Sequence, residues 1–169
     1  VFLLGPSHQH PMRKCAVSGA SSWETPMGDL PVDTAIISEL FATGEFLRMD
    51  KDMDETEHSL ELHTPFISVS LQERWGSNKC MLVPIMVGQL TEEKEKIYGR
   101  ILAPYLDDPE TLFCVSSDFC HWGARFGYVW KDHPGEIWEA IQWLDHEGMK
   151  EIESLEHRRF RAYLTKYKN

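Results

Sequence analysis

Residues 1–8 have the sequence VFLLGPSH, in which an apolar run ends abruptly at Gly5 and Pro6 and is followed by His8. The run does not alternate between apolar and polar residues, and this pattern is typical of a strand buried on both faces of a parallel sheet. Two further runs, residues 81–87 and 111–116, have the same character. The sequence therefore predicts three buried strands in one sheet.

Helical patterns separate these strands. The predicted helices span residues 33–43, 55–71, 91–106 and most of the chain beyond Pro134. Asp33 and Thr91 are suitable N-caps for two of them, and Pro65 should kink or restart a third. Residues 15–33, rich in Gly and Pro, predict an irregular or antiparallel excursion over one edge. The alternation indicates an α/β fold with three layers, in which helices cover both faces of a mostly parallel central sheet.

Length and composition limit the possible functions. The chain has 169 residues, enough for one domain, and a formal net charge of −10, which argues against a nucleic-acid partner. No apolar run is long enough to span a membrane, so we expect no membrane insertion. The four cysteines form no C-x-x-C pair, which predicts reduced thiols and an intracellular protein. Because the chain opens inside a strand-like run, we expect a single domain over residues 1–169 that is incomplete at both ends.

Two predicted strands end in the same kind of loop. The first strand leads through small residues to His8, and the third leads through Ser116, Ser117 and Asp118 to His121. If both strands are parallel, their loops open at the same edge of the sheet, where α/β proteins bind ligands. Imidazoles bind transition metals and act as bases near neutral pH, and a nearby Asp118 can orient one. The alternative is that both histidines only make local hydrogen bonds.

Residues 54–63, DETEHSLELH, form a third candidate cluster. On a continuous helix Glu57 and Glu61 would be like charges four residues apart, a strained acidic face that invites a partner. The alternative is a solvated acidic helix with Thr56 as its N-cap. The spacing of His58 and His63 excludes the H-E-x-x-H signature of zinc proteases. His10, His133, His146 and His157 have no convergent partner in the sequence and are expected at the surface.

Five motifs resemble, in the same order, those of the Memo family, mediators of cell motility driven by receptor tyrosine kinases. They are LGPSHQHP (4–11), ETPMGDLPVD (24–33), DETEHSLELHTPF (54–66), VPIMVGQL (83–90) and SSDFCHWGARFGY (116–128). The similarity runs from Val1 to Asn169. It implies the fold of the class III extradiol dioxygenases, non-haem iron enzymes to which the family is related.

The resemblance also implies a metal pocket for copper or iron. Family members hold the metal with the histidine of G-P-S-H, a histidine of an upstream P-H-A-G motif and a cysteine of a downstream C-G-R-H-P motif. Only the first has a counterpart in these residues, His8, so the site is expected to be incomplete in this chain. Asp118 and His121 match the other polar residues of the pocket, and His121 stands where the dioxygenases keep their acid/base histidine.

The function implied by the resemblance is signalling and cell motility through the cytoskeleton, in the cytoplasm and also the nucleus, with a redox-capable pocket. The implied partners are phosphotyrosine-bearing receptor tails or adaptor proteins. Two alternatives stay open: a non-enzymatic module that binds phosphotyrosine peptides in a vestigial pocket, and a working non-haem iron dioxygenase. Whether the chain is a metal-dependent oxidoreductase is left undecided, because a thiolate ligand in the family favours copper over simple Fe(II) oxygen chemistry.

Overall fold

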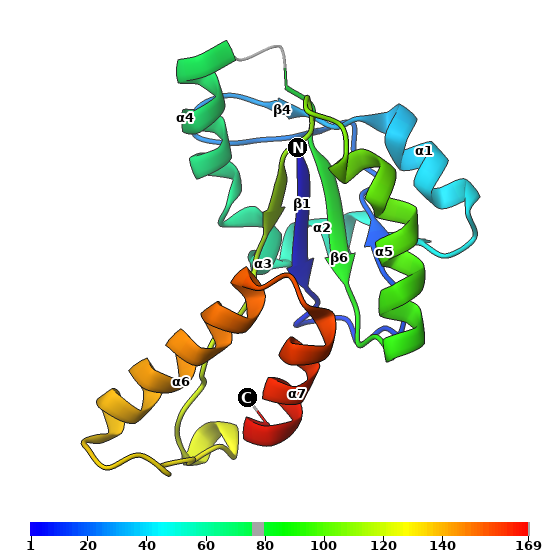
Figure 1. Ribbon diagram of the computed structural model, residues 1–169. Helices are drawn as coiled ribbons and strands as arrows, with labels where there is room; N and C mark the ends of the chain where they lie inside the picture. The colour runs from blue at the N-terminus through cyan, green and yellow to red at the C-terminus, as the bar shows by residue number, and fades with distance from the viewer. Residues whose placement is uncertain (76–79, 169) are drawn as a thin grey trace. The chain divides into compact units, whose positions relative to one another are not determined.

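The computed structural model describes residues 1–75 and 80–168, with only the backbone for residues 72–75. It divides into two compact units, Val1–Ser117 and Asp118–Asn169, which are described separately below (Figure 1). None of the helices in the described part of the chain has the length and apolar run needed to cross a bilayer. The expectation of a single domain over residues 1–169 stays a prediction.

The first unit is built on a five-stranded sheet with the order β5-β2-β6-β1-β7. Three neighbouring strands run parallel: the inner strands β6 (Val83–Val87) and β1 (Phe2–Pro6) and the edge strand β7 (Phe113–Val115). Phe2 of β1 lies beside both Val83 and Phe113. These are the strands predicted from the apolar runs. The predicted α/β class with a mostly parallel sheet is confirmed.

The predicted excursion, residues 15–33, adds one strand to the sheet, and a short strand outside that stretch forms the edge beside it. Strand β2 (Ala16–Val17) pairs antiparallel with β6, and β5 (Leu47–Arg48) pairs parallel with β2. Between them, β3 (Ser22–Trp23) and β4 (Leu30–Pro31) make a separate antiparallel pair. Short strands suit this Gly- and Pro-rich segment, since proline cannot donate to a ladder.

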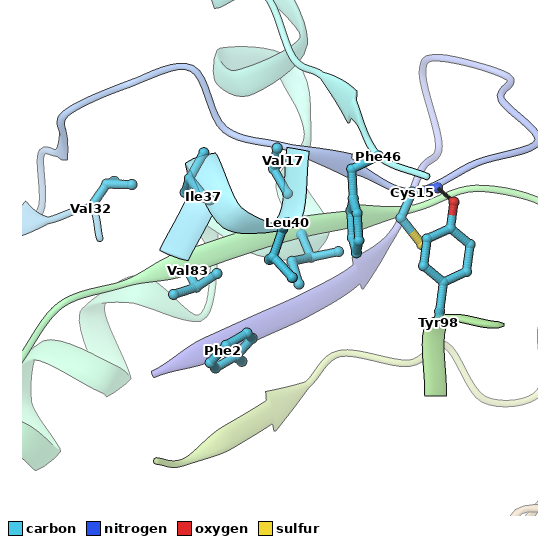
Figure 2. Packing of buried hydrophobic residues seen from close by; sticks show 10 residues of the cluster. Phe2, Cys15, Val17, Val32, Ile37, Leu40, Phe46, Val83 and Tyr98 are labelled. Carbon is cyan, nitrogen blue, oxygen red and sulfur yellow. Dashed lines mark hydrogen bonds between the residues drawn. The ribbon is translucent and has the colours of Figure 1, made fainter. Parts of the chain in front are cut away.

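Helices α1 (Thr34–Ala42) and α5 (Glu92–Leu106) cover one face of the sheet (Figure 1). Both begin at the predicted caps, where the Asp33 and Thr91 side chains accept backbone N–H groups in the first turn. Figure 2 shows the core beneath them, in which the Tyr98 hydroxyl accepts the backbone N–H of Cys15 at 2.9 Å. The sequence pattern had not marked Tyr98, although it is the buried residue of α5.

The other face is covered by α3 (His58–Glu61) and α4 (Thr64–Trp75), which follow α2 (Lys51–Thr56). Leu60, Ile67 and Leu71 pack there against Leu3 and Met86. Because Leu3 alternates with Phe2, which faces α1 and α5, β1 contributes to the core on both faces. Helices on both faces complete the three layers that the sequence predicts.

The helical stretch predicted over residues 55–71, with a kink or restart at Pro65, falls in three helices. A new helix, α4, starts next to Pro65, as predicted. Pro65 lies in the first turn of α4, where a backbone N–H would have no helical hydrogen-bond partner, so its absence costs nothing. A second break, not predicted, falls at Glu57, whose backbone is extended with φ −90° and ψ 107°. Thr56 is the last residue of α2 and not an N-cap, so that interpretation is wrong. Glu57 and Glu61 therefore do not form a like-charge pair on one helix face.

The second unit contains a short 3-10 turn, η1 (Ala124–Phe126), and the helices α6 (Ile137–Glu153) and α7 (His157–Tyr167). Leu155, with φ 54°, breaks the helical pattern that the sequence predicts beyond Pro134. The Tyr163 hydroxyl donates to the Leu144 carbonyl at 3.1 Å, and Gly148 leaves room for its ring. These contacts pack α7 against α6.

We expect Gly5→Ala to destabilise the first unit by about 1–3 kcal/mol, because overpacking of a core costs that much. A Cβ atom at Gly5 would lie 2.6 Å from Ser59 Oγ and 2.9 Å from Leu60 Cδ2. Urea unfolding measures the loss. Gly99→Ala is the matched control: it adds a methyl group in open space on α5 and should stabilise by about 0.5–1 kcal/mol. Equal stabilities of the two variants would contradict this account of β1 and α3.

Candidate metal centre

Three side chains gather at the carboxyl end of β1: His8, Glu57 and His58. His8 lies in the loop after β1, Glu57 is the N-cap residue of α3, and His58 is the first residue of that helix. The glycine at position 5 lets α3 approach β1 closely, and the Ser59 hydroxyl donates to the Pro6 carbonyl at 2.8 Å. The start of α3 is thereby held beside the loop that carries His8.

Glu57 is the centre of this cluster, and its side chain is fully buried, with 0% exposure. Its Oε2 accepts the backbone N–H of His8 at 2.7 Å, and its Oε1 accepts the backbone N–H of Ser59 at 3.0 Å. Oε1 also lies 2.9 Å from Nδ1 of the His8 ring. Every one of these contacts favours a carboxylate over a carboxylic acid.

These contacts determine the ionisation of Glu57. Burial by itself would raise the pKa of a carboxyl group, but the hydrogen bonds from His8 and Ser59 outweigh it and lower the pKa of Glu57 from 4.5 to about 2. The group is therefore a carboxylate at neutral pH. A buried negative charge next to two imidazoles is an environment that attracts a cation.

His58 completes the cluster from the other side. Its Nδ1 lies 3.5 Å from Glu57 Oε1, and its ring stacks on that of His8 with centroids 4.5 Å apart and planes 29° apart. The side chains of His8 and His58 are 27% and 51% exposed. The buried carboxylate is thus bordered by two imidazoles that reach solvent.

The donor set fits a transition metal. Two imidazole nitrogens and one carboxylate oxygen lie within 4.8 Å of one another, and imidazole suits copper, iron and zinc. Three of the thiols are poor thiolate donors, because burial raises the pKa of Cys15 to about 12 and raises the pKa of Cys114 and Cys120 above the ordinary value. All four cysteines, each within the described residues, are free thiols, as expected.

The other predicted site residues, Asp118 and His121, belong to the second unit, and both are exposed within the described chain. The His121 ring lies against Phe126, with centroids 4.9 Å apart. The neighbouring Cys120 donates its backbone N–H to Asp145 at 3.0 Å. The expectation that His8, Asp118 and His121 converge on one pocket stays a prediction.

Sequence reasoning identified His8 but missed its partners. Glu57 and His58 lie in the third candidate cluster, for which the sequence left open an acidic helix face that invites a partner and a solvated one, and neither alternative places Glu57 beside His8. No local signal marks Glu57 as the start of a helix, because glutamate is not among the preferred N-cap residues. His10, expected to be a bystander, places Nε2 3.2 Å from Thr56 Oγ1, next to the cluster but outside it.

A cavity of about 810 Å³ lies elsewhere in the first unit, beside the β3–β4 pair. Trp23, Arg48 and Asp54 contribute to its wall, and none of His8, Glu57 and His58 does. Burial raises the pKa of Asp54, although Ser18 and Gly19 donate hydrogen bonds to its Oδ2. This cavity is separate from the candidate metal centre.

Comparison with known proteins supports the resemblance seen in the motifs. The family model described as Memo-like protein matches residues 1–169. Protein MEMO1 of Homo sapiens and that of Rattus norvegicus are each 44% identical over 170 residues, covering all of this chain and 57% of the relative. Protein memo-1 homolog of Caenorhabditis elegans is 43% identical over 171 residues, covering all of this chain and 48% of the relative. The chain thus spans about half the length of these curated relatives.

The depressed pKa of Glu57 predicts a specific loss of stability in acid. Since its folded pKa of about 2 lies below the unfolded value of 4.5, the contribution is fully present above pH 4.5 and is lost as the pH falls toward 2. Over that window the wild type should take up about one more proton on unfolding than Glu57→Gln does. Urea unfolding across pH 2–7 measures this difference. Parallel pH dependences for the two proteins would contradict the prediction.

Proposed function

The chain belongs to the Memo family, and from this premise we propose that it is an intracellular signalling protein of cell motility whose His8 binds a redox-active metal ion, copper or iron. The observation that carries the proposal is the cluster at the end of β1, where a buried carboxylate holds the His8 ring. Because the chain spans about half of its relatives, the activity and partners of the whole protein are part of the proposal.

The chemistry of the cluster supports copper or iron. Neutral imidazole is a good ligand for both metals, and the adjacent Glu57 carboxylate offsets part of the charge of a bound cation. Either metal would supply one-electron redox chemistry when bound. The residues of this chain contribute a nitrogen ligand at His8 and a fixed negative charge at Glu57.

We assign the acid/base part of the pocket to Asp118 and His121, as the family resemblance implies. Both are exposed side chains of the loop that follows β7, and histidine is the side chain that proteins use most often as a general acid or base. In this proposal His121 donates or accepts a proton and Asp118 orients the reacting group. A working dioxygenase would use the same residues, and oxygen uptake with catechols after anaerobic Fe(II) loading would identify it.

A second candidate function is a module that binds phosphotyrosine peptides of receptor tails or adaptor proteins. The observation in its favour is the group of exposed basic side chains on α7 and at its C-cap, Arg158, Lys166 and Lys168. Against it, Arg159 is already held by Glu151, with N–O distances of 2.7 and 3.1 Å. We therefore place metal binding first.

We expect the full-length protein to retain copper or iron and its His8→Ala variant to lose it, because the variant lacks one of the nitrogen ligands. Elemental analysis after dialysis against metal-free buffer gives the stoichiometry. His10→Ala is the matched control, since it removes an imidazole from the same loop without touching Glu57. Unchanged metal content in His8→Ala would rule out the proposal.

The peptide-binding candidate makes its own prediction. A phosphotyrosine peptide should bind without metal, and the double variant Arg158→Ala/Lys168→Ala should weaken that binding by about tenfold, since each phosphate contact of this kind is charge-assisted. Isothermal titration with the phosphorylated peptide and its unphosphorylated form measures the effect. Flat titrations with and without metal would remove this candidate.

A further inference from the structure

Glu57 contacts His8 at two points of the same residue. Its Oε2 accepts the His8 backbone N–H at 2.7 Å, and its Oε1 lies 2.9 Å from the ring nitrogen Nδ1. The first contact fixes where the residue sits, and the second fixes the rotation of its ring. A carboxylate that only neutralised the charge of a bound cation would not need to contact both the backbone and the ring of His8.

We propose that Glu57 is a positioning residue, which holds the His8 ring in one orientation with its proton on Nδ1, so that the nitrogen offered to the metal is Nε2. This inference rests on the proposed function, because it concerns how His8 serves as a ligand. It gives two of the three clustered side chains different roles: His8 binds the metal, and Glu57 acts through His8.

The hydrogen bonds determine which nitrogen carries the proton. Both oxygens of Glu57 accept backbone N–H groups, from His8 and from Ser59, as an ionised carboxylate does. Such a carboxylate accepts hydrogen bonds only, so a neutral His8 ring beside it must donate from Nδ1. The lone pair of that tautomer is on Nε2. Carboxylate–histidine pairs of this kind orient metal-binding rings in many proteins.

The ring is held on its face as well as at its edge. The His58 ring stacks on it at a centroid distance of 4.5 Å. Because a ring nitrogen offers its lone pair in the plane of the ring, a stacked neighbour restricts tilting without competing for the Nε2 direction. Edge and face contacts together leave the His8 ring one preferred orientation.

Glu57 is itself fixed by the fold. Its side chain is the N-cap of α3, and Ser59 and Leu60 anchor that helix to the sheet: the Ser59 hydroxyl donates to the Pro6 carbonyl, and Leu60 is fully buried. These contacts place the carboxylate independently of any metal. The orientation of His8 is therefore expected to exist before a metal ion binds, which lowers the ordering cost of binding.

The first experiment uses the unaltered protein. In metal-free protein at a pH where the imidazole is neutral, the ¹⁵N signals of the His8 ring, assigned by their loss in His8→Gln, should show the Nδ1–H tautomer. His10 on the same loop serves as the internal reference, because it does not contact Glu57. A His8 ring that is mainly Nε2–H overturns the proposal, whether or not the protein binds metal.

The second experiment compares Glu57→Gln with Glu61→Gln. Glu61 is an exposed residue of the same helix, so its variant makes the same charge change away from His8. Glu57→Gln should lower the Nδ1–H fraction of metal-free His8 and weaken copper or iron binding roughly 10–100-fold, whereas Glu61→Gln should change neither. If Glu57→Gln does not fold, Glu57→Asp keeps the carboxylate with a shorter reach and should shift the tautomer partly.

The outcomes separate this inference from the proposed function. Wild-type metal binding with an unchanged tautomer and affinity in the Glu57 variants overturns the positioning role and leaves metal binding in place. A wild type without metal binding overturns the proposed function, while the tautomer of His8 still decides whether Glu57 orients the ring. Loss of both the tautomer and the affinity in Glu57→Gln alone supports the inference.

Discussion

The hydrogen bonds of the buried Glu57 carboxylate connect the two segments of the first unit that form its candidate site. One carboxylate joins the loop after β1 to the first turn of α3, through N–H groups of His8 and Ser59 that are 51 residues apart in the chain. An ionised group at this depth is costly unless it is fully hydrogen-bonded. The close approach of α3 to Gly5, the break between α2 and α3 and the stacked imidazoles all lie next to that carboxylate.

The sheet makes this arrangement rigid. Strand β1 lies between two parallel neighbours and packs a large side chain on each face, Phe2 on one and Leu3 on the other. The position and direction of its carboxyl end are therefore fixed, and His8 lies two residues beyond that end. A metal-binding side chain on a loop is positioned well only when the preceding strand is held in place and the loop itself is held by hydrogen bonds. Both conditions hold here for the described residues of the first unit.

Patterns that depend on neighbouring residues were predictable from the sequence, and those that depend on distant contacts were not. The apolar runs gave β1, β6 and β7, and the caps Asp33 and Thr91 gave the starts of α1 and α5. In contrast, the sequence offered Thr56 as an N-cap, whereas the N-cap of α3 is Glu57. The carboxylate of Glu57 accepts the backbone N–H of His8, which lies far away in sequence. Helical periodicity treats a glutamate at such a position as solvated. Nothing local reveals that it is buried.

The charge of Glu57 also bears on the kind of ligand that the cluster accepts. A carboxylate with its pKa lowered to about 2 keeps a negative charge beside His8 at neutral pH. A phosphate group placed at His8 would meet that charge at short range, and the formal net charge of −10 adds to the repulsion. A cation at the same place would be attracted by both. The electrostatics of the cluster therefore favour a metal ion at His8, and a phosphopeptide, if it binds this chain, would have to bind at the basic residues of α7.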